Sequence, residues 1–441
     1  MNKKFAISLF SSSGIGDIAL KKSKYNVLVA NELLEDRSKL YKLNFPETEM
    51  ITGDIWIKKE EIIKTTKKIV RNNKLDLALV SPPCQGMSKN GRGKLLSEIK
   101  AGRRPKEDPR NALIIPAIEI ISSLKPETIV FENVIEMKNT LISINKKALL
   151  ITDYIKEKLP EYIVDVNEVN FADYGVPQNR KRLITIVTKN KKLINFYNKF
   201  GTLIPETTHS KQGKDKKKWI SVKDKIFGLE KLDGKSKLRS ENDPLHKIVK
   251  LDDRKYWWVS NTPSNESAFN NQCINCNYKE NLRHTSKKNS SGVNTSSKNT
   301  PIYCSKCKSL LPRPTTIKNN IVKLMKGFTS AYKRMSWSEP ASTITRNFPY
   351  VCSDNKIHPQ QHRALSYREA CILHTIEKQD FKFIDDSKNQ TNDVLIRDTL
   401  GESIPPKFLE TLLEFFEKIE KKKITFKIPK QQKFLFTQSL N

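Results

Sequence analysis

The sequence predicts an α/β protein, in which a mostly parallel sheet is joined to a smaller and less regular second domain. Short apolar runs alternate with helical segments over the first 190 of the 441 residues, as in parallel sheets with crossover helices. Several of these runs stop at glycine, proline or an acidic residue, as strands do where they reach a sheet edge. The middle of the chain has little periodicity and is rich in Ser, Asn and Lys. We therefore expect a sheet domain over 1–190, an insert over 191–330, a return segment over 331–420 and a basic tail over 421–441.

The first strand is expected over residues 4–9, before a glycine turn at 10–17 and a helix from Ile18 to about Lys22. A strand, a glycine turn and a helix are the usual seat of a nucleotide-like ligand in α/β proteins. A lone Gly-x-Gly is equally consistent with a tight turn that binds nothing.

Acidic residues follow the next two expected strands. Glu32 lies beyond a strand over residues 25–30, and Asp54 lies beyond a strand that ends near Thr52. A carboxylate at the tip of the second strand suits the two hydroxyls of a ribose. Each acid alone would more often be a surface residue, but together with the glycine turn they predict an adenosyl-type pocket.

A fourth strand, over residues 75–80, stops at two prolines that are followed by Cys84. Because proline fixes the backbone, the thiol is expected on a stiff turn at the carboxyl end of the sheet, where such sheets bind ligands. A buried structural cysteine is the alternative. The following loop, 85–111, holds eight Lys and Arg against three acids, which suits either a lid over a phosphate backbone or a solvated linker.

The next apolar strand, 128–131, ends at Glu132, a plausible proton donor or, alternatively, a helix cap. Arg180 and Arg182 stand at the start of a later strand, two residues apart, and should share a face. Paired arginines there suit a carbonyl oxygen, a carboxylate or a phosphate, whereas a solvated basic patch is the alternative.

Charge is concentrated in the middle of the chain. Residues 191–326 carry 29 Lys and Arg against 11 Asp and Glu, more than half of the net charge of +32 of the whole chain. Such a concentration favours a nucleic-acid surface over a general drift in composition. In the same region two Cys-x-x-Cys pairs have the spacing of a four-thiolate zinc site: Cys273, Cys276, Cys304 and Cys307. A redox pair is the alternative for such a motif. Four thiolates leave no open coordination position, so the metal is expected to be structural.

The seven cysteines do not form a disulfide scaffold, and no apolar run approaches the length of a membrane span. The amino-terminal apolar stretch is too short for a signal peptide. We expect a soluble, cytoplasmic protein without a membrane partner.

In this order, three motifs resemble those of the C5-cytosine DNA methyltransferases: Pro82-Pro83-Cys84-Gln85, Glu132-Asn133-Val134 and Gln178-x-Arg180-x-Arg182. The segments 334–346 and 401–406 resemble the family regions that close the variable insert and the fold. The resemblance implies a Rossmann-like class I methyltransferase sheet with helices on both faces and a target-recognition domain. It also implies transfer of a methyl group from S-adenosylmethionine to C5 of a cytosine flipped out of duplex DNA.

The resemblance assigns roles residue by residue. The Cys84 thiolate would attack C6 of the base, Glu132 would hold the exocyclic amine and N3, Arg182 would hold O2, and Arg180 would help to position Cys84 or its loop. The cofactor would contact six residues, with Glu32 at the ribose, Asp54 at the adenine amine and Pro83 beside the methyl donor: Phe10, Gly14, Gly16, Glu32, Asp54 and Pro83.

The sequence departs from the family pattern twice. Two serines lengthen the glycine turn, where Asp17 replaces its last glycine, and Glu402 stands where an asparagine is common. Both changes affect the expected cofactor region.

The leading interpretation is a monomeric, nucleoid-associated bacterial enzyme that protects DNA as the partner of a restriction endonuclease. A methyltransferase acting on transfer RNA is one alternative, and a catalytically silent, zinc-dependent DNA-binding protein is another. A cysteine hydrolase is poorly supported, because the first histidine of the chain is His209.

Overall fold

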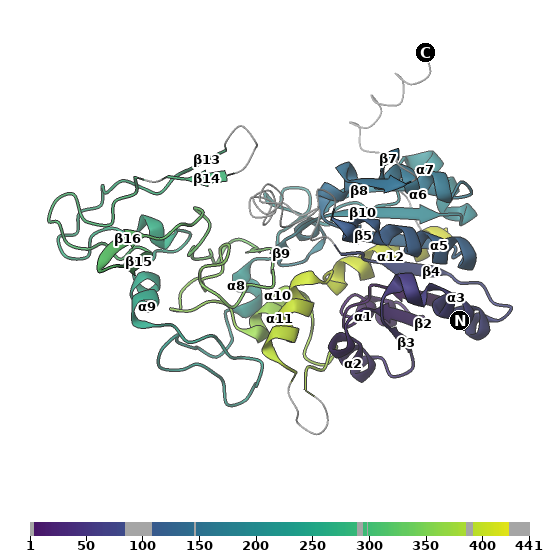
Figure 1. Cartoon of the computed structure of the whole chain (residues 1–441), viewed down its shortest axis with the longest axis horizontal. Coiled ribbons are helices and arrows are strands. Elements are labelled where there is room, and N and C mark those ends of the chain that lie inside the picture. The colour runs from purple at the N-terminus through teal and green to yellow at the C-terminus, as the bar shows by residue number, and fades with distance from the viewer. Residues whose placement is uncertain are drawn as a thin grey trace, which may run out of the picture.

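The computed structural model describes residues 4–83, 108–144, 147–288, 294–297, 299–384 and 391–422. Figure 1 shows two lobes, one built on the large sheet and the other on irregular chain with short hairpins. Between them lie α8 (Val222–Ile226), α10 (Tyr367–Leu373) and α11 (Asp393–Glu402). Within the described ranges, every helix is too short or too polar to cross a lipid bilayer.

The first lobe is organised by a seven-stranded sheet in the order β3-β2-β1-β4-β5-β10-β8. The strands are β1 (Lys4–Leu9), β2 (Tyr25–Glu32), β3 (Glu49–Thr52), β4 (Leu77–Val80), β5 (Thr128–Asn133), β8 (Ile163–Asn170) and β10 (Lys181–Thr188). All neighbouring pairs are parallel except those that β10 makes with β5 and β8. A central, mostly parallel sheet is therefore confirmed.

Helices cover both faces of this sheet. One face packs against α3 (Ile55–Val70), α5 (Ile114–Leu124) and α6 (Ile151–Lys158), and the other against α1 (Asp17–Lys22), α7 (Lys191–Phe200) and α12 (Pro406–Glu420). Successive side chains on β4 alternate between the two faces, with Ala78 and Val80 in one core and Leu77 and Leu79 in the other. This alternation explains why the buried strand reads as a continuous apolar run.

Helix α7 begins at residue 191, where we expected the insert to begin, but it packs with the sheet. Its residues Leu193 and Phe196 are buried in the same core as α12 and the sheet. Asn190 caps the helix by accepting from the backbone N–H groups of Lys192 and Leu193, so strand β10 passes directly into it. The packing places this helix with the sheet lobe.

The second lobe contains short elements around two small cores. The larger core includes Trp258, Phe269 and Tyr332, and the smaller one includes the cysteines of the two Cys-x-x-Cys pairs. Apart from α8 (Val222–Ile226), which packs with α10 and α11 between the lobes, the helices and strands that follow in chain order are α9 (Asp253–Ser260), β13 (Ser286–Lys288), β14 (Asn294–Ser296), β15 (Thr315–Lys318) and β16 (Ile321–Leu324).

The remaining elements connect the lobes or extend the sheet lobe: α2 (Glu35–Asn44), β6 (Leu141–Ile144), β7 (Lys147–Leu150), β9 (Gln178–Asn179), β11 (His209–Ser210), β12 (Lys217–Lys218), β17 (Ala341–Ser342), α10 (Tyr367–Leu373) and α11 (Asp393–Glu402), with 3-10 turns at η1 (Pro109–Leu113), η2 (Ile135–Asn139), η3 (Phe171–Tyr174) and η4 (Ala268–Asn270).

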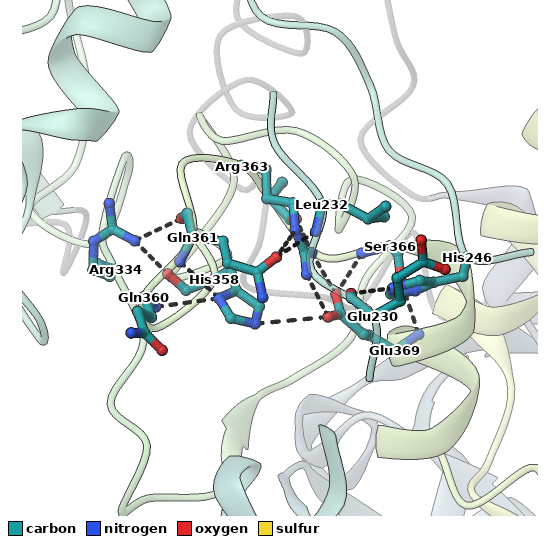
Figure 2. A network of polar contacts seen from close by, with 11 residues as sticks. Glu230, Leu232, His246, Arg334, His358, Gln360, Gln361, Arg363, Ser366 and Glu369 are labelled. Carbon is teal, nitrogen blue, oxygen red and sulfur yellow. Dashed lines mark hydrogen bonds and ion pairs between the residues drawn. The ribbon is translucent and has the colours of Figure 1, made fainter. Parts of the chain in front are cut away.

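A buried polar network fixes the junction between the lobes (Figure 2). At its centre the guanidinium of Arg363 donates to both carboxylate oxygens of Glu369, at 2.7 Å each, and neither side chain is exposed. Burial alone would raise the pKa of Glu369, but the charge and hydrogen bonds of Arg363 outweigh it and lower this pKa to about 2. Beside it, Arg334 donates to the carbonyl oxygens of Val259 and His358. The network thereby connects the return segment to the insert.

Candidate active site

The predicted acid and one predicted arginine meet at the carboxyl end of β5. Nε of Arg182 lies 2.9 Å from Oε1 of Glu132, and both side chains are largely buried, with 14% and 7% exposed. The antiparallel pairing of β10 with β5 sets this contact, because Ile184 lies opposite Glu132 and places Arg182 on the same face one step further along. No side-chain cap is formed at the following turn, so Glu132 is not a helix cap.

The neighbour of Glu132 holds the segment that precedes the predicted nucleophile. The side-chain amide of Asn133 donates to the carbonyl oxygen of Pro82 at 3.0 Å, and the N–H of Ser81 donates to the carbonyl oxygen of Leu9. Ser81 and Pro82 are therefore fixed between β1 and β5. Cys84 and residues 85–107 of the following loop lie outside the described residues, whereas Pro83 stands half-buried immediately before them.

Arg180 is fully buried and contacts the return segment. Its guanidinium donates to the carbonyl oxygens of Ile344, Gly401 and Ser403 at 2.9 to 3.1 Å. These contacts connect the strand that carries Arg182 to the end of α11. The structure thus shows Arg180 bridging chain segments, while any contact with Cys84 lies outside what is described.

A second bridge runs beside Arg180 through a histidine that the sequence analysis did not single out. Nε2 of Gln178 lies 3.2 Å from Nδ1 of His374, and Oγ of Ser403 lies 2.9 Å from its Nε2. Because Oε1 of Gln178 accepts from the N–H of Ile344, its amide nitrogen faces the ring, so Nδ1 accepts and Nε2 carries the proton. Burial, and then the charges of the nearby arginines, lower the pKa of His374 well below its usual value, so the ring is neutral.

The glycine turn after β1 has the tight geometry that its sequence predicts. Gly14 has a φ of +87°, and a Cβ placed there would meet the ring of Phe45 at 2.6 Å, so no larger residue fits. Phe10 has a φ of +57°, which is a strained conformation for an aromatic residue. Gly16 leads into α1 and lies against Ile404 of the return segment. The turn is therefore packed between Phe45, at the end of α2, and Ile404 of the return segment.

The two serines that lengthen this turn place polar atoms inside it. Oγ of Ser12 and Oγ of Ser13 are buried and have no hydrogen-bond partner among the described residues. Buried hydroxyls without partners are costly, so a ligand that accepts from them would relieve that cost.

The two predicted carboxylates lie at adjacent strand ends. Glu32 accepts from the N–H groups of Ser12 and Leu34, and burial raises its pKa. Asp54 caps α3 by accepting from the N–H of Trp56 at 3.0 Å. The N–H of Gly53 donates to the carbonyl oxygen of Glu32, which holds the two strand ends together.

Asp17, the replacement for the usual glycine, is a buried bridge. Its carboxylate accepts from the hydroxyls of Ser8 at 2.9 Å and Tyr41 at 2.6 Å, and thereby connects β1, α1 and α2. Burial raises the pKa of Asp17 to about 6, although both hydrogen bonds oppose the shift.

Glu402, the other departure, forms an ion pair beside the same edge. It lies 2.8 Å from Arg37 of α2 and 3.6 Å from Arg346. Next to it, a Cβ on Gly401 would meet the backbone N of Arg346 at 2.3 Å, so α11 approaches the return loop too closely for any side chain. The charge of Glu402 is thus compensated by basic residues that the sequence did not indicate.

The four predicted metal ligands converge. Their sulfur atoms lie within 4.8 Å of one another, and three sulfur pairs are 3.5 to 3.7 Å apart: Cys273–Cys276, Cys273–Cys307 and Cys276–Cys304. A tetrahedral zinc ion with bonds of about 2.3 Å would separate its sulfurs by roughly 3.8 Å. The donor set and its spacing therefore fit zinc.

Sequence comparison shows which known proteins this chain resembles. The model of the family described as C-5 cytosine-specific DNA methylase matches residues 5–418. The type II methyltransferase M1.HgaI of Avibacterium volantium is 29% identical over 420 residues, which cover 92% of this chain and 96% of that protein. The type II methyltransferase M.AquIA of Picosynechococcus is 30% identical over 243 residues, 52% of this chain and 90% of that protein.

Solved structures share the fold. A prophage-encoded protein of E. coli aligns with a TM-score of 0.54 and 19% identity, over 95% of this chain and 99% of that one. The methyltransferase EhMeth of Entamoeba histolytica aligns with a TM-score of 0.50 and 15% identity, over 96% of this chain and 100% of the other.

Proposed function

The chain belongs to the C-5 cytosine-specific DNA methylase family, and from that premise we propose that it methylates C5 of a flipped cytosine within a specific duplex sequence. We further propose that it protects DNA from a partner restriction endonuclease. The observation that carries the proposal is the pair formed by Glu132 and Arg182, beside the Pro82 carbonyl that Asn133 holds.

The proposed chemistry assigns one task to each residue at this edge. Cys84, as thiolate, attacks C6 of cytosine, because C5 is not nucleophilic until such an adduct forms. Glu132 holds the exocyclic amine and N3 and offsets the charge that builds on the ring. Arg182 donates to O2, and loss of the C5 proton with release of the thiolate completes the cycle.

S-adenosylmethionine supplies the electrophilic methyl group when it is bound. The residues at the glycine turn fit this cofactor, since the buried hydroxyls of Ser12 and Ser13 lack partners and the carboxylate of Glu32 lies at the neighbouring strand end. We assign the ribose hydroxyls to Glu32 and the adenine amine to Asp54, with Phe10, Gly14, Gly16 and Pro83 forming the wall. Arg180 is assigned a positioning role, since its described contacts lie with the return segment.

We propose that the insert recognises the target and that its four cysteines hold structural zinc. The concentration of Lys and Arg in the insert supports contacts with phosphates, and the sulfur spacing supports the metal. Similarity to type II methyltransferases supports the partnership with a nuclease.

Trapping of the covalent adduct tests the activity directly. Duplex DNA from a host that expresses the chain is converted with bisulfite and sequenced to find the target, and a matching oligonucleotide is made with 5-fluorocytosine. The enzyme with S-adenosylmethionine should form a denaturation-resistant conjugate through Cys84, and Cys84→Ser should form none while still binding duplex DNA. Transfer of labelled methyl groups to transfer RNA instead of duplex DNA would overturn the proposal.

A further inference from the structure

The second lobe carries a polar pocket of about 220 Å³ between two chain segments, 265–270 and 329–333. We propose that this pocket reads the edge of a guanine-containing base pair in the target duplex, with Lys333 as the specificity-determining residue. The assignment rests on the proposed function and names a part of the chain that determines which sequence is methylated. The pocket is lined by Asn265, Glu266, Ser267, Asn270, Thr329, Ser330 and Lys333.

Several lining side chains are available to a ligand. Among the residues that the structure describes, the side chains of Asn265, Thr329, Ser330 and Lys333 have no hydrogen-bond or ion-pair partner. One ammonium, one amide and two hydroxyls therefore converge on a single hollow. Glu266 also lines it, but its carboxylate is paired with Arg283 at 3.0 Å.

The floor of the pocket is rigid. The hydroxyl of Ser267 donates to the carbonyl oxygen of Ala331 at 2.8 Å, and the N–H of Ala268 donates to the carbonyl oxygen of Tyr332 at 2.9 Å. Phe269 and Tyr332 are buried in the core immediately beneath. A preformed surface loses little entropy on binding and can therefore discriminate between similar base pairs.

The segment 273–307, which carries the four cysteines and is called the four-cysteine module here, contacts the same pocket. Its segment 283–284 reaches the lining at two points, through Arg283 to Glu266 and through the N–H of His284 to Oδ1 of Asn270 at 2.8 Å. Nε2 of His284 also lies 2.9 Å from the carbonyl oxygen of Gly327, just before the second pocket segment. A metal that fixes the module would thereby fix the pocket walls.

Short contacts lead from the pocket to the candidate active site. The N–H of Asn355 donates to the carbonyl oxygen of Ser330 at 2.8 Å, and the hydroxyl of Ser342 donates to the carbonyl oxygen of Asn355 at 3.1 Å. Ser342 on β17 pairs with Asn179 on β9, three residues before Arg182. The pocket is therefore fixed relative to the arginine that would hold the flipped base.

The chemistry of Lys333 selects the base. An ammonium group only donates hydrogen bonds, and guanine presents two adjacent acceptors, O6 and N7, in the major groove. Cytosine presents a donor there and adenine only one acceptor. Lys333 should therefore favour one guanine, while the amide and hydroxyls contact neighbouring edges.

Methylation of a set of duplexes tests this assignment. Once the target of the wild-type enzyme is known from bisulfite sequencing, each base pair is replaced singly and kcat/KM is measured for the wild type and for Lys333→Met. We expect the variant to lose roughly 10- to 100-fold of its discrimination at one guanine and to keep its discrimination elsewhere. Asn265→Ala should relax a neighbouring position.

Lys326→Met provides a matched control, because Lys326 is an exposed lysine on the same stretch of chain outside the pocket. This variant should weaken binding equally for all sequences or leave it unchanged. If Lys333→Met behaves in the same way, Lys333 contacts phosphate or nothing, and base reading by the pocket is overturned while the methyltransferase activity stands. If the wild type methylates no duplex, the proposed function fails together with the pocket.

Discussion

Asn133 and Pro82 are joined by a hydrogen bond of 3.0 Å that connects the end of β5 to the segment before Cys84. Glu132 precedes Asn133 directly, so the candidate acid and the backbone leading to the candidate nucleophile are held by consecutive residues of one strand. This hydrogen bond therefore fixes the backbone of Pro82 relative to the strand end that carries Glu132.

Replacing Asn133 by alanine should lower kcat while leaving the KM for S-adenosylmethionine nearly unchanged. The unpaired Pro82 carbonyl should also cost about 1–3 kcal/mol of unfolding free energy. Methyl-transfer kinetics and urea unfolding measure the two effects. Asn261→Ala is the control, because Asn261 also donates to a backbone carbonyl, that of Trp257, but in the second lobe. It should lose stability with a normal kcat, and a normal kcat in Asn133→Ala would contradict the positioning role.

Replacing Glu132 by glutamine keeps the size of the side chain but removes the charge that faces Arg182. We expect kcat to fall roughly 10²- to 10⁴-fold, the usual contribution of a positioned acid. The dissociation constant of S-adenosylmethionine, measured by calorimetry, should not change. Glu168→Gln on β8 removes an exposed carboxylate that faces Lys138 and should leave both quantities unaltered.

The Arg363–Glu369 pair should contribute stability that depends on pH. The pKa of Glu369 is about 2 in the folded protein against an ordinary 4.5, so the contribution is complete above about pH 4.5 and is lost as the pH falls toward 2. Arg363→Met leaves a buried charge unpaired and should cost about 3–5 kcal/mol at pH 7. Arg363→Met combined with Glu369→Leu should recover much of this loss. The free energy of unfolding of the double variant, measured with urea, should also fall less than that of the wild type as the pH drops from 4.5 toward 2. A double variant as unstable as the single one would show that the pair is not the source.

Asp17 should have the opposite pH dependence. Its folded pKa of about 6 lies above its ordinary 3.8, so the folded state binds more protons between these values and stability falls as the pH rises from 4 to 6. Asp17→Asn should remove this fall. Relative to the wild type, the free energy of unfolding of the variant should therefore be higher at pH 7 than near pH 4. Urea midpoints at both pH values measure the difference, and parallel curves for the two proteins would contradict the raised pKa.

Zinc should be measurable at about one ion per purified chain by elemental analysis. Removal of the metal by a chelator should impair sequence discrimination before it affects cofactor binding, because the cysteines lie in the second lobe. Cys304→Ser should lose the metal, whereas Cys352→Ser, at an exposed cysteine outside the cluster, should keep it. Protein without zinc but with full discrimination would exclude this role.

Much of the sheet could be predicted because its strands are short apolar runs with clear ends. The first strand was expected over 4–9 and is found there, and the ends of β2 and β5 carry the expected acids. The antiparallel direction of β10 could not be predicted, because strand direction depends on long-range pairing that leaves no local pattern. Helix α7 was assigned to the insert because its packing also depends on long-range contacts: its apolar stripe belongs to the sheet core.

The polar residues were harder to place. Arg180, between β9 and β10, and Arg182, on β10, were expected to share a face from their spacing, yet Arg182 faces Glu132 while Arg180 reaches carbonyl oxygens more than 160 residues away. His374 and Arg37 carried no signal, since a lone histidine or arginine is usually structural or solvated. Their partners lie on distant segments that only the fold brings together.

Helix α12 has a consequence for synthesis of the protein. Its apolar side chains cover one face of the sheet whose first strand is made some 400 residues earlier, and Glu420 pairs with Lys4. Helices α1 and α7 can cover part of that face earlier, but the part that α12 covers stays exposed until residue 420 has been made, so the amino-terminal strands depend on a late partner for their final packing. The newly made chain should therefore gain its ability to modify DNA in one late step rather than gradually. Cells that make it slowly should need chaperones to cover the exposed apolar side chains of the sheet until α12 has been made.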